Sequence, residues 1–186
     1  MSAAPNHPNA SLPGFDAPAV GFERPFEMLE ACHDRVRRSL ALLGRLVEHI
    51  DARGHDEQSR GAARDVLRYF DLAAPHHHED EERHVFPRLL ATGDAGLAAD
   101  VLRLRADHER MGALWGALRG VLQRWAGPDA AGAIDAATRS AVVDFRAAYD
   151  GHIELEEGRV FPAARALVDA DALAAMGTEM AARRRA

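Results

Sequence analysis

The chain has 186 residues, of which 47% are hydrophobic and 28% charged, a balance that is ordinary for one globular domain with its own core. The formal net charge of −6 argues against nucleic acid as the main partner, and the single cysteine, Cys32, excludes an intramolecular disulfide. No apolar run is long enough to span a membrane, and no basic segment precedes an apolar one at the N-terminus, so we expect a cytoplasmic protein.

Residues 1–21 contain proline, glycine, alanine and asparagine without periodicity, which predicts a disordered N-terminal tail. The pattern changes at Pro25. From there, one side chain every three or four positions is apolar or histidine, as along one face of an amphipathic helix, and Gly54 is a suitable end. This stripe consists of Phe26, Leu29, His33, Val36, Leu40, Leu43, Val47 and Ile50.

A second helix is expected to begin after Asp56, a good N-cap residue, with Pro87 and Gly93 marking its end. Because Pro75 removes one backbone donor within this helix, we expect a kink there. The inner stripe of the second helix runs through Ala63, Phe70, Ala74, His77, Glu81 and Val85.

A third helix is predicted between Asp94, a capping residue, and Gly127-Pro128. Its stripe consists of Leu97, Val101, Leu104, His108, Met111, Trp115, Leu118, Leu122 and Trp125.

A fourth helix is expected from about Ala133, with Pro162 interrupting it. Its stripe consists of Ile134, Thr138, Val142, Phe145, Tyr149, His152, Glu156 and Val160. A shorter helix from Ala164 to about Ala181 and a solvated basic run, 183–185, complete the chain.

Four long helices with short connections predict an all-α fold, an antiparallel up-down-up-down four-helix bundle with a short C-terminal helix. We place the bundle at residues 22–162 and the C-terminal helix with its basic tail at 163–186.

Each long helix has a histidine in its apolar stripe: His33, His77, His108 and His152. Two of these have a glutamate four residues later, Glu81 and Glu156, on the same helix face and one turn away. The two segments also repeat: residues 77–87 and 152–162 align without gaps and share the pattern His-x-Glu-x-Glu-Glu-x-x-Val-Phe-Pro. Such a repeat predicts a pseudo-twofold arrangement of the two helix pairs.

Buried carboxylates among histidines are costly unless cations compensate their charge. Two buried glutamates and four histidines therefore predict two metal ions, and imidazole with carboxylate suits iron, manganese or zinc. Glutamates that bridge two ions are the di-iron carboxylate solution inside a helical bundle.

The triplet 76–78 leaves the register open, because His78 and Glu82 also have i,i+4 spacing. The apolar stripe and the alignment with His152 both favour His77. His76, His78 and His84 are then expected to be flanking residues.

The order His, His-x-x-x-Glu, His, His-x-x-x-Glu over four helices resembles the hemerythrin HHE cation-binding family, over roughly residues 22–162. The resemblance implies two iron ions as the cofactor, bridged by carboxylates and an oxo or hydroxo group. It implies His33, His77, Glu81, His108, His152 and Glu156 as iron ligands, with Glu81 and Glu156 as the bridges.

One position departs from the oxygen-carrying members, which have a second histidine four residues after the one on the third helix. Here that position is Gly112, so Tyr149 and Glu30 are the candidates for a seventh ligand or a supporting contact. Met111, Gly112 and Trp115 are candidates for the wall of a small-ligand pocket, although Met111 and Trp115 also fit an ordinary core.

The resemblance implies a protein that binds or reacts with O₂, NO or peroxide. Weak peroxidase- or catalase-like turnover is left open, and iron or oxygen sensing and iron storage or delivery are the alternatives. We expect a small diatomic molecule or peroxide as the partner, with no nucleic acid and no membrane.

Overall fold

A computed structural model describes residues 20–185, and these form an all-α protein in which no strand occurs. The expectation of a disordered tail over 1–21 falls mainly on residues 1–19, which lie outside the described range. The helical segments are α1 (Pro25–Arg53), α2 (Glu57–Arg68), η1 (Tyr69–Ala73), α3 (Ala74–Asp80), η2 (Glu81–Val85), α4 (Phe86–Leu90), α5 (Ala95–Ala126), α6 (Ala136–Leu155), η3 (Glu156–Val160), α7 (Phe161–Arg165) and α8 (Ala170–Arg183).

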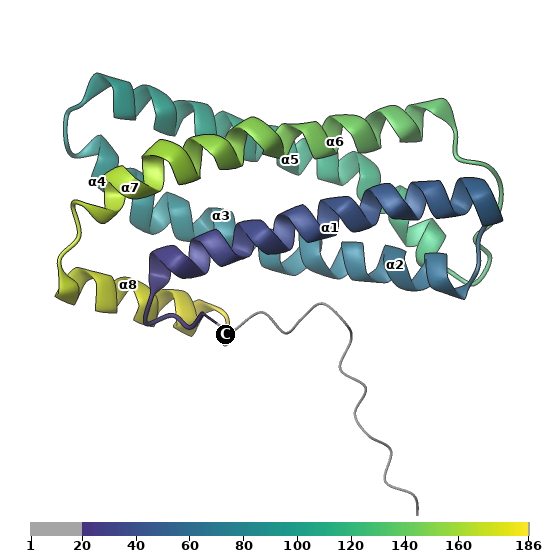
Figure 1. Cartoon of the computed structure of the whole chain (residues 1–186), viewed down its shortest axis with the longest axis horizontal. Helices are drawn as coiled ribbons and strands as arrows, with labels where there is room; N and C mark the ends of the chain where they lie inside the picture. The colour runs from purple at the N-terminus through teal and green to yellow at the C-terminus, as the bar shows by residue number, and fades with distance from the viewer. Residues whose placement is uncertain (1–19, 186) are drawn as a thin grey trace, which may run out of the picture.

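The long helices form a four-helix bundle. Each of α1 and α5 contacts both α2 and α6, and consecutive long helices run in opposite directions (Figure 1). The segments α2 to α4 make up the second arm of the bundle, and α6, η3 and α7 make up the fourth. The predicted up-down-up-down topology is therefore confirmed. None of the helices between residues 20 and 185 combines the length and the apolarity needed to cross a membrane.

Aspartates begin four of the helices. The side chains of Asp56, Asp94, Asp135 and Asp169 each accept a hydrogen bond from the backbone N–H three residues later, at 2.7–2.9 Å. The caps predicted at Asp56 and Asp94 are thus confirmed. Asp135 and Asp169 correct the starts expected near Ala133 and Ala164, because each cap begins its helix at the following residue.

Pro75, Pro87 and Pro162 all lie within helical segments. The second arm ends at Leu90, between Pro87 and Gly93 as expected, whereas Pro162 does not interrupt the fourth arm, which continues to Arg165. Each of Pro75, Pro87 and Pro162 follows a five-residue π-turn (η1, η2 and η3). The residue before each proline donates its N–H to the carbonyl five residues earlier. A regular α-helix would set the proline ring against the carbonyl four residues back, and the wider turn avoids that clash. The chain therefore stays helical to Leu90 and Arg165.

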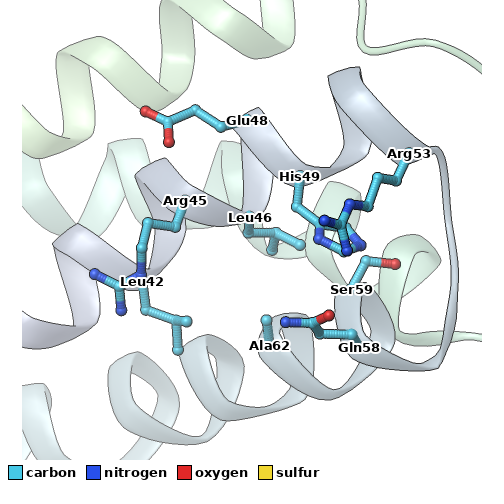
Figure 2. A pocket seen from close by; sticks show the side chains of 9 residues that line it. All are labelled: Leu42, Arg45, Leu46, Glu48, His49, Arg53, Gln58, Ser59 and Ala62. Atoms are coloured by element: carbon cyan, nitrogen blue, oxygen red, sulfur yellow. The ribbon is translucent and has the colours of Figure 1, made fainter.

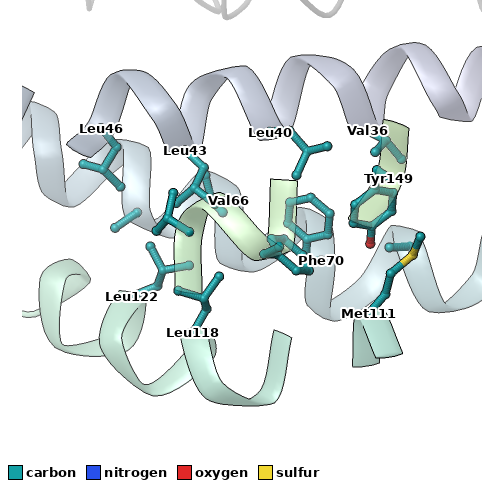
Figure 3. Close-up of a cluster of buried hydrophobic side chains, with 14 of the residues drawn as sticks. Val36, Leu40, Leu43, Leu46, Val66, Phe70, Met111, Leu118, Leu122 and Tyr149 are labelled. Carbon is teal, nitrogen blue, oxygen red and sulfur yellow. The ribbon is translucent and has the colours of Figure 1, made fainter. Parts of the chain in front are cut away.

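Two apolar clusters occupy the two halves of the bundle. The larger one fills the half that contains the C-terminal part of α1 (Figure 3), and its buried residues include Val36, Leu40, Leu43, Val66, Phe70, Met111, Leu118, Leu122, Phe145 and Tyr149. The other contains Phe26, Leu29, Cys32, Val85, Phe86, Leu89, Val101, Leu104, Val160, Phe161, Met176 and Met180. We call these the distal cluster and the proximal cluster.

The C-terminal helix α8 packs against the N-terminal part of α1 and closes the proximal cluster (Figure 1). Its end is not the solvated basic run that the sequence suggested. Arg183 and Arg184 both form ion pairs with Asp80, whose side chain is fully buried. A buried carboxylate needs a cationic partner, and these arginines provide it.

Candidate metal centre

The six side chains expected as ligands lie in one layer between the two apolar clusters. His33, His77, His108 and His152 come from α1, α3, α5 and α6, and all are at most 8% exposed. Glu81 and Glu156 are fully buried, and each is the first residue of a π-turn. The structure therefore brings together all six residues that the sequence placed on the inner faces of the helices.

The layer divides into two halves, and each glutamate faces both. Oε1 of Glu81 lies 3.1 Å from Nε2 of His77, whereas its Oε2 lies 3.4 Å from Nε2 of His108. Similarly, Oε2 of Glu156 lies 3.0 Å from Nε2 of His33, and its Oε1 lies 3.2 Å from Nε2 of His152. One half thus contains two imidazoles with one oxygen from each glutamate, and the other half repeats this set.

The donor atoms of this layer lack partners of the kind that buried polar groups require. Both oxygens of Glu81 and of Glu156 are buried, and no residue between 20 and 185 offers either carboxylate a hydrogen bond. The same holds for the Nε2 atoms of His33, His108 and His152. Such groups are costly to bury unless something else satisfies them. Two cations, one in each half, would satisfy both carboxylates and their imidazoles at once, so the donor set fits a two-metal site.

Burial sets the protonation states of the metal-free site. It raises the pKa of the Glu81 carboxyl well above its ordinary value, and the neighbouring charge of Glu156 raises it further. For Glu156, burial also acts to raise the pKa, but the approach of His152 and His33 outweighs it and holds the pKa well below the ordinary value. The pair therefore retains a proton on Glu81. Burial lowers the pKa of His77 and His108, which keeps these imidazoles neutral and able to bind a cation.

The second glutamate of each repeat orients a histidine on a neighbouring helix. Nδ1 of His108 lies 2.8 Å from Glu82, and Nδ1 of His33 lies 2.9 Å from Glu157. Since an ionised carboxylate only accepts hydrogen bonds, each Nδ1 carries the proton and leaves the Nε2 lone pair directed at the site. Arg37 also binds Glu157, at 2.8 Å.

The phenylalanines of the two repeats contact the same two histidines. The ring of Phe161 stacks on His33 with a centroid distance of 5.4 Å, and that of Phe86 stacks on His108 at 5.7 Å. Each repeat therefore supplies a candidate ligand histidine, a glutamate that faces both halves of the layer, an orienting glutamate and a stacking ring. The pseudo-twofold relation inferred from the sequence therefore applies to the six ligand candidates, the two orienting glutamates and the two stacking rings.

His78 also reaches the centre, which the sequence analysis did not anticipate. A nitrogen of His78 lies within 4.8 Å of donor nitrogens of His108 and His152. The i,i+4 spacing allowed both His77 and His78, and the apolar stripe and the alignment with His152, which select a single helix face, favoured His77. The consecutive histidines were the available signal: adjacent residues differ by about 100° around a helix, so they can face two different ions.

The other candidates occupy different surroundings. Tyr149 is buried among Phe70 and Phe145, and burial together with the charge of Glu81 raises the pKa of its phenol. Glu30 is not brought to the centre; it lies at the surface and forms an ion pair with Arg165 at 3.2 Å.

The three residues expected to form the wall of a small-ligand pocket also lie in different surroundings. Met111 is buried in the distal cluster, and Trp115 donates from Nε1 to Asp71 at 2.9 Å while packing against that cluster. Gly112 is exposed, and a Cβ added there would meet no atom within 4 Å. Gly112 therefore neither forms a wall of the centre nor permits a close helix contact.

A separate hollow of about 400 Å³ lies between α1 and α2, near the turn that joins them (Figure 2). Its lining includes Arg45, His49 and Ser59 but none of the six ligand candidates. His49 is held there by Asp56, at 2.9 Å. This hollow is therefore not part of the metal layer.

Comparison with known proteins agrees with this geometry. A protein of Haemophilus influenzae (strain ATCC 51907 / DSM 11121 / KW20 / Rd), described as an uncharacterized protein, is 33% identical over 163 residues, which cover 88% of this chain and 91% of that protein. The family model for the hemerythrin HHE cation binding domain matches residues 24–164, a range that contains the four arms of the bundle except the last residue of α7, and every ligand candidate. By its sequence and by its bundle, this chain belongs to the hemerythrin HHE cation-binding family.

Proposed function

We propose that this chain is a non-haem di-iron protein that binds or reacts with O₂, NO or peroxide in the core of its bundle. The observation that carries the proposal is the division of the two glutamates: each presents one oxygen to each pair of histidines. This arrangement suits two ions bridged by carboxylates, and an oxo or hydroxo group would complete the bridge.

The donor set is compatible with iron, and membership of the hemerythrin HHE family supports iron over manganese or zinc. Imidazole and carboxylate without thiolate suit iron in di-metal bundle sites. Cys32 does not compete as a ligand, because burial raises the pKa of its thiol and its Sγ contacts Met28. Bound iron would supply the redox chemistry and the position at which a diatomic molecule or peroxide binds.

The chain itself would control what reaches that position. The distal and proximal clusters flank the polar layer with apolar side chains, which limits the entry of water and of large substrates. Val36, Met111 and Tyr149, each three residues from a ligand histidine, are drawn at the same end of the distal cluster in Figure 3. Since its raised pKa keeps the Tyr149 phenol protonated, this group can donate a hydrogen bond to a small molecule bound in the layer.

The test is anaerobic loading with ferrous iron followed by elemental analysis and visible spectroscopy in the presence of O₂, NO and peroxide. We expect two iron ions per chain and a distinct spectral change with at least one of these molecules. A stoichiometry near one or zero would remove the di-metal proposal. If two ions bind but the visible spectrum changes with none of the three molecules, iron storage or delivery would be the better-supported function.

Iron sensing is the second candidate, and the C-terminal contacts favour it. Asp80, which precedes the bridging Glu81, is the residue that Arg183 and Arg184 hold. Loss of iron from Glu81 would therefore affect its neighbour Asp80, the residue that anchors α8. Limited proteolysis of the metal-loaded and chelated proteins tests this candidate, which requires faster cleavage between α7 and α8 after chelation.

A further inference from the structure

The two halves of the metal layer are not equal, because one of them has a third histidine beside it. His77 and His78 follow one another in α3, and their rings are 5.9 Å apart. His77 faces the half that contains His33, and the His33 and His77 ring centroids lie 4.8 Å apart. His78 faces the other half, where its ring stacks on His108 with a centroid distance of 4.0 Å.

The Nε2 atom of His78 has the features of a ligand atom. It is buried, and no hydrogen-bond partner for it exists among residues 20–185. His78 groups with His108 and His152, which are the two imidazoles of that half. Three imidazole rings converge there, with one oxygen each from Glu81 and Glu156 beside His108 and His152.

We propose that His78 Nε2 is a third imidazole ligand of the metal ion held by His108 and His152. This inference rests on the proposed two-metal site and specifies its coordination. The protein would then supply two histidines to one ion and three to the other, together with the two bridging carboxylates.

The assignment changes the meaning of Gly112. The oxygen carriers that the sequence resembles take their seventh protein ligand from the third helix, at the position of Gly112. Here the seventh ligand would come from the second helix, so the glycine would leave no ligand missing. The ion with two histidines, beside His33 and His77, would be the one with more positions available to an exogenous molecule.

The first experiment uses the unmodified protein loaded with two equivalents of Zn²⁺, a diamagnetic ion that accepts the same donors. Nitrogen NMR of the histidine rings distinguishes a coordinated nitrogen from a free one. We expect five histidines with a coordinated Nε2. Four coordinated histidines, with His78 free, would overturn the assignment while leaving the two-metal site intact.

The second experiment compares His78→Ala with His76→Ala, which removes a half-buried neighbour outside the metal layer. Loss of even an indirect partner of a metal ligand costs about 10–100-fold in affinity, and loss of a ligand should cost at least as much. In Zn²⁺ titrations with a competing chelator, we expect His78→Ala to weaken one equivalent by at least about 10-fold. The other equivalent, and both equivalents in His76→Ala, should keep their affinities.

Equal affinities for both equivalents in His78→Ala and the unmodified protein would overturn the proposal. If His78→Ala fails to fold, the NMR result on the unmodified chain decides the question alone. An unmodified protein that binds fewer than two ions would count against the two-metal function itself, an outcome that both experiments report separately from the role of His78.

Discussion

Nδ1 of His108 lies 2.8 Å from a carboxylate oxygen of Glu82, and the repeat reproduces this contact between His33 and Glu157 at 2.9 Å. The two contacts differ in one respect. Arg37 shares Glu157, whereas no arginine or lysine among residues 20–185 pairs with Glu82. Glu82 therefore retains more of its charge to increase the basicity of its histidine, and the two metal positions should differ in affinity.

Replacing either orienting glutamate should weaken one metal position selectively. Glu82→Gln should weaken the ion at His108, and Glu157→Gln the ion at His33, each by roughly 10–100-fold, because the Nδ1 proton loses its carboxylate acceptor. Competition titrations with Zn²⁺ measure both equivalents. The matched control is Glu154→Gln, an exposed carboxylate on α6. Equal weakening of both equivalents by either variant would contradict the division into halves.

Glu81→Gln should stabilise the metal-free protein at neutral pH and destabilise the metal-loaded one. The raised pKa of Glu81 adds stability below the ordinary glutamate pKa, and this contribution is lost as the pH rises towards the folded value. An uncharged amide avoids that loss but cannot bridge two ions. We expect the thermal midpoint after chelation to rise by about 2–4 °C for each ~1 kcal/mol gained. With metal, the order should reverse. If the thermal midpoint of metal-free Glu81→Gln is instead lower than that of the metal-free unmodified protein, ionisation of the buried Glu81 beside Glu156 does not destabilise the fold.

Metal binding should release a proton and strengthen as the pH increases. Between the ordinary and the raised pKa of Glu81, the metal-free site holds a proton that a cation must displace. His77 and His108 add little competition near neutral pH, because burial lowers the pKa of both. Calorimetry in two buffers with different ionisation heats measures the released protons. Affinity that does not change with pH would show that Glu81 is already ionised.

Asp80→Ala should release α8. The aspartate is fully buried between Arg183 and Arg184, and removal of one partner from a buried ion pair costs about 3–5 kcal/mol. We expect faster proteolysis in the 166–169 connection and a clearly lower thermal midpoint. Asp150→Ala, which removes an exposed aspartate from α6, controls for the loss of one charge. Unchanged proteolysis in Asp80→Ala would mean that the remaining contacts of α8, namely the ion pairs of Glu179 with Arg83 and His84 and the burial of Met176 and Met180, suffice to hold it in place.

Gly112→Ala should stabilise the protein without affecting metal loading. A Cβ at this position meets no atom within 4 Å, and alanine is favoured over glycine in a helix by about 1 kcal/mol. That gain corresponds to a rise in the thermal midpoint of about 2–4 °C for a chain of this size. Elemental analysis checks the loading. A loss of iron in this variant would show that the space beside Gly112 serves the centre after all.

The sequence predicted the bundle and the six inner ligand candidates because both depend on one property, the helical period. His33 and Glu156 lie on faces that are otherwise apolar, and this can be recognised without coordinates. His78 could not be recognised in this way, since it belongs to a neighbouring face and its proposed role depends on the position of His108 on another helix. The ion-pair partner of Arg183 and Arg184 could not be predicted for the same reason, because Asp80 is about a hundred residues away in the chain.

The helical course of the chain through its prolines could not be predicted, for a different reason. Pro87 and Pro162 are strong stop signals in a regular α-helix, but a π-turn removes the clash that would make them so. Whether the backbone adopts a π-turn depends on which groups of the other helices its side chains contact. Glu81 and Glu156 must face the bundle core, and that requirement comes from the other helices.

The π-turns also set the direction of the side chains that follow them. In a regular α-helix, residues five positions apart point about 140° away from each other, so Glu81 and Phe86 could not both face the interior. The bond from the Phe86 N–H to the Glu81 carbonyl brings the two residues nearly into line, and the same holds for Phe161 and Glu156. Each π-turn thus takes up one extra residue and keeps the glutamate and the ring on the same helix face. A single helix can then supply both a carboxylate and the aromatic ring that stacks on the histidine opposite. Deleting one residue from such a turn would restore a regular α-helix in which the ring, now four positions after the glutamate, still faces the interior, but the proline that follows would then clash with the carbonyl four residues earlier.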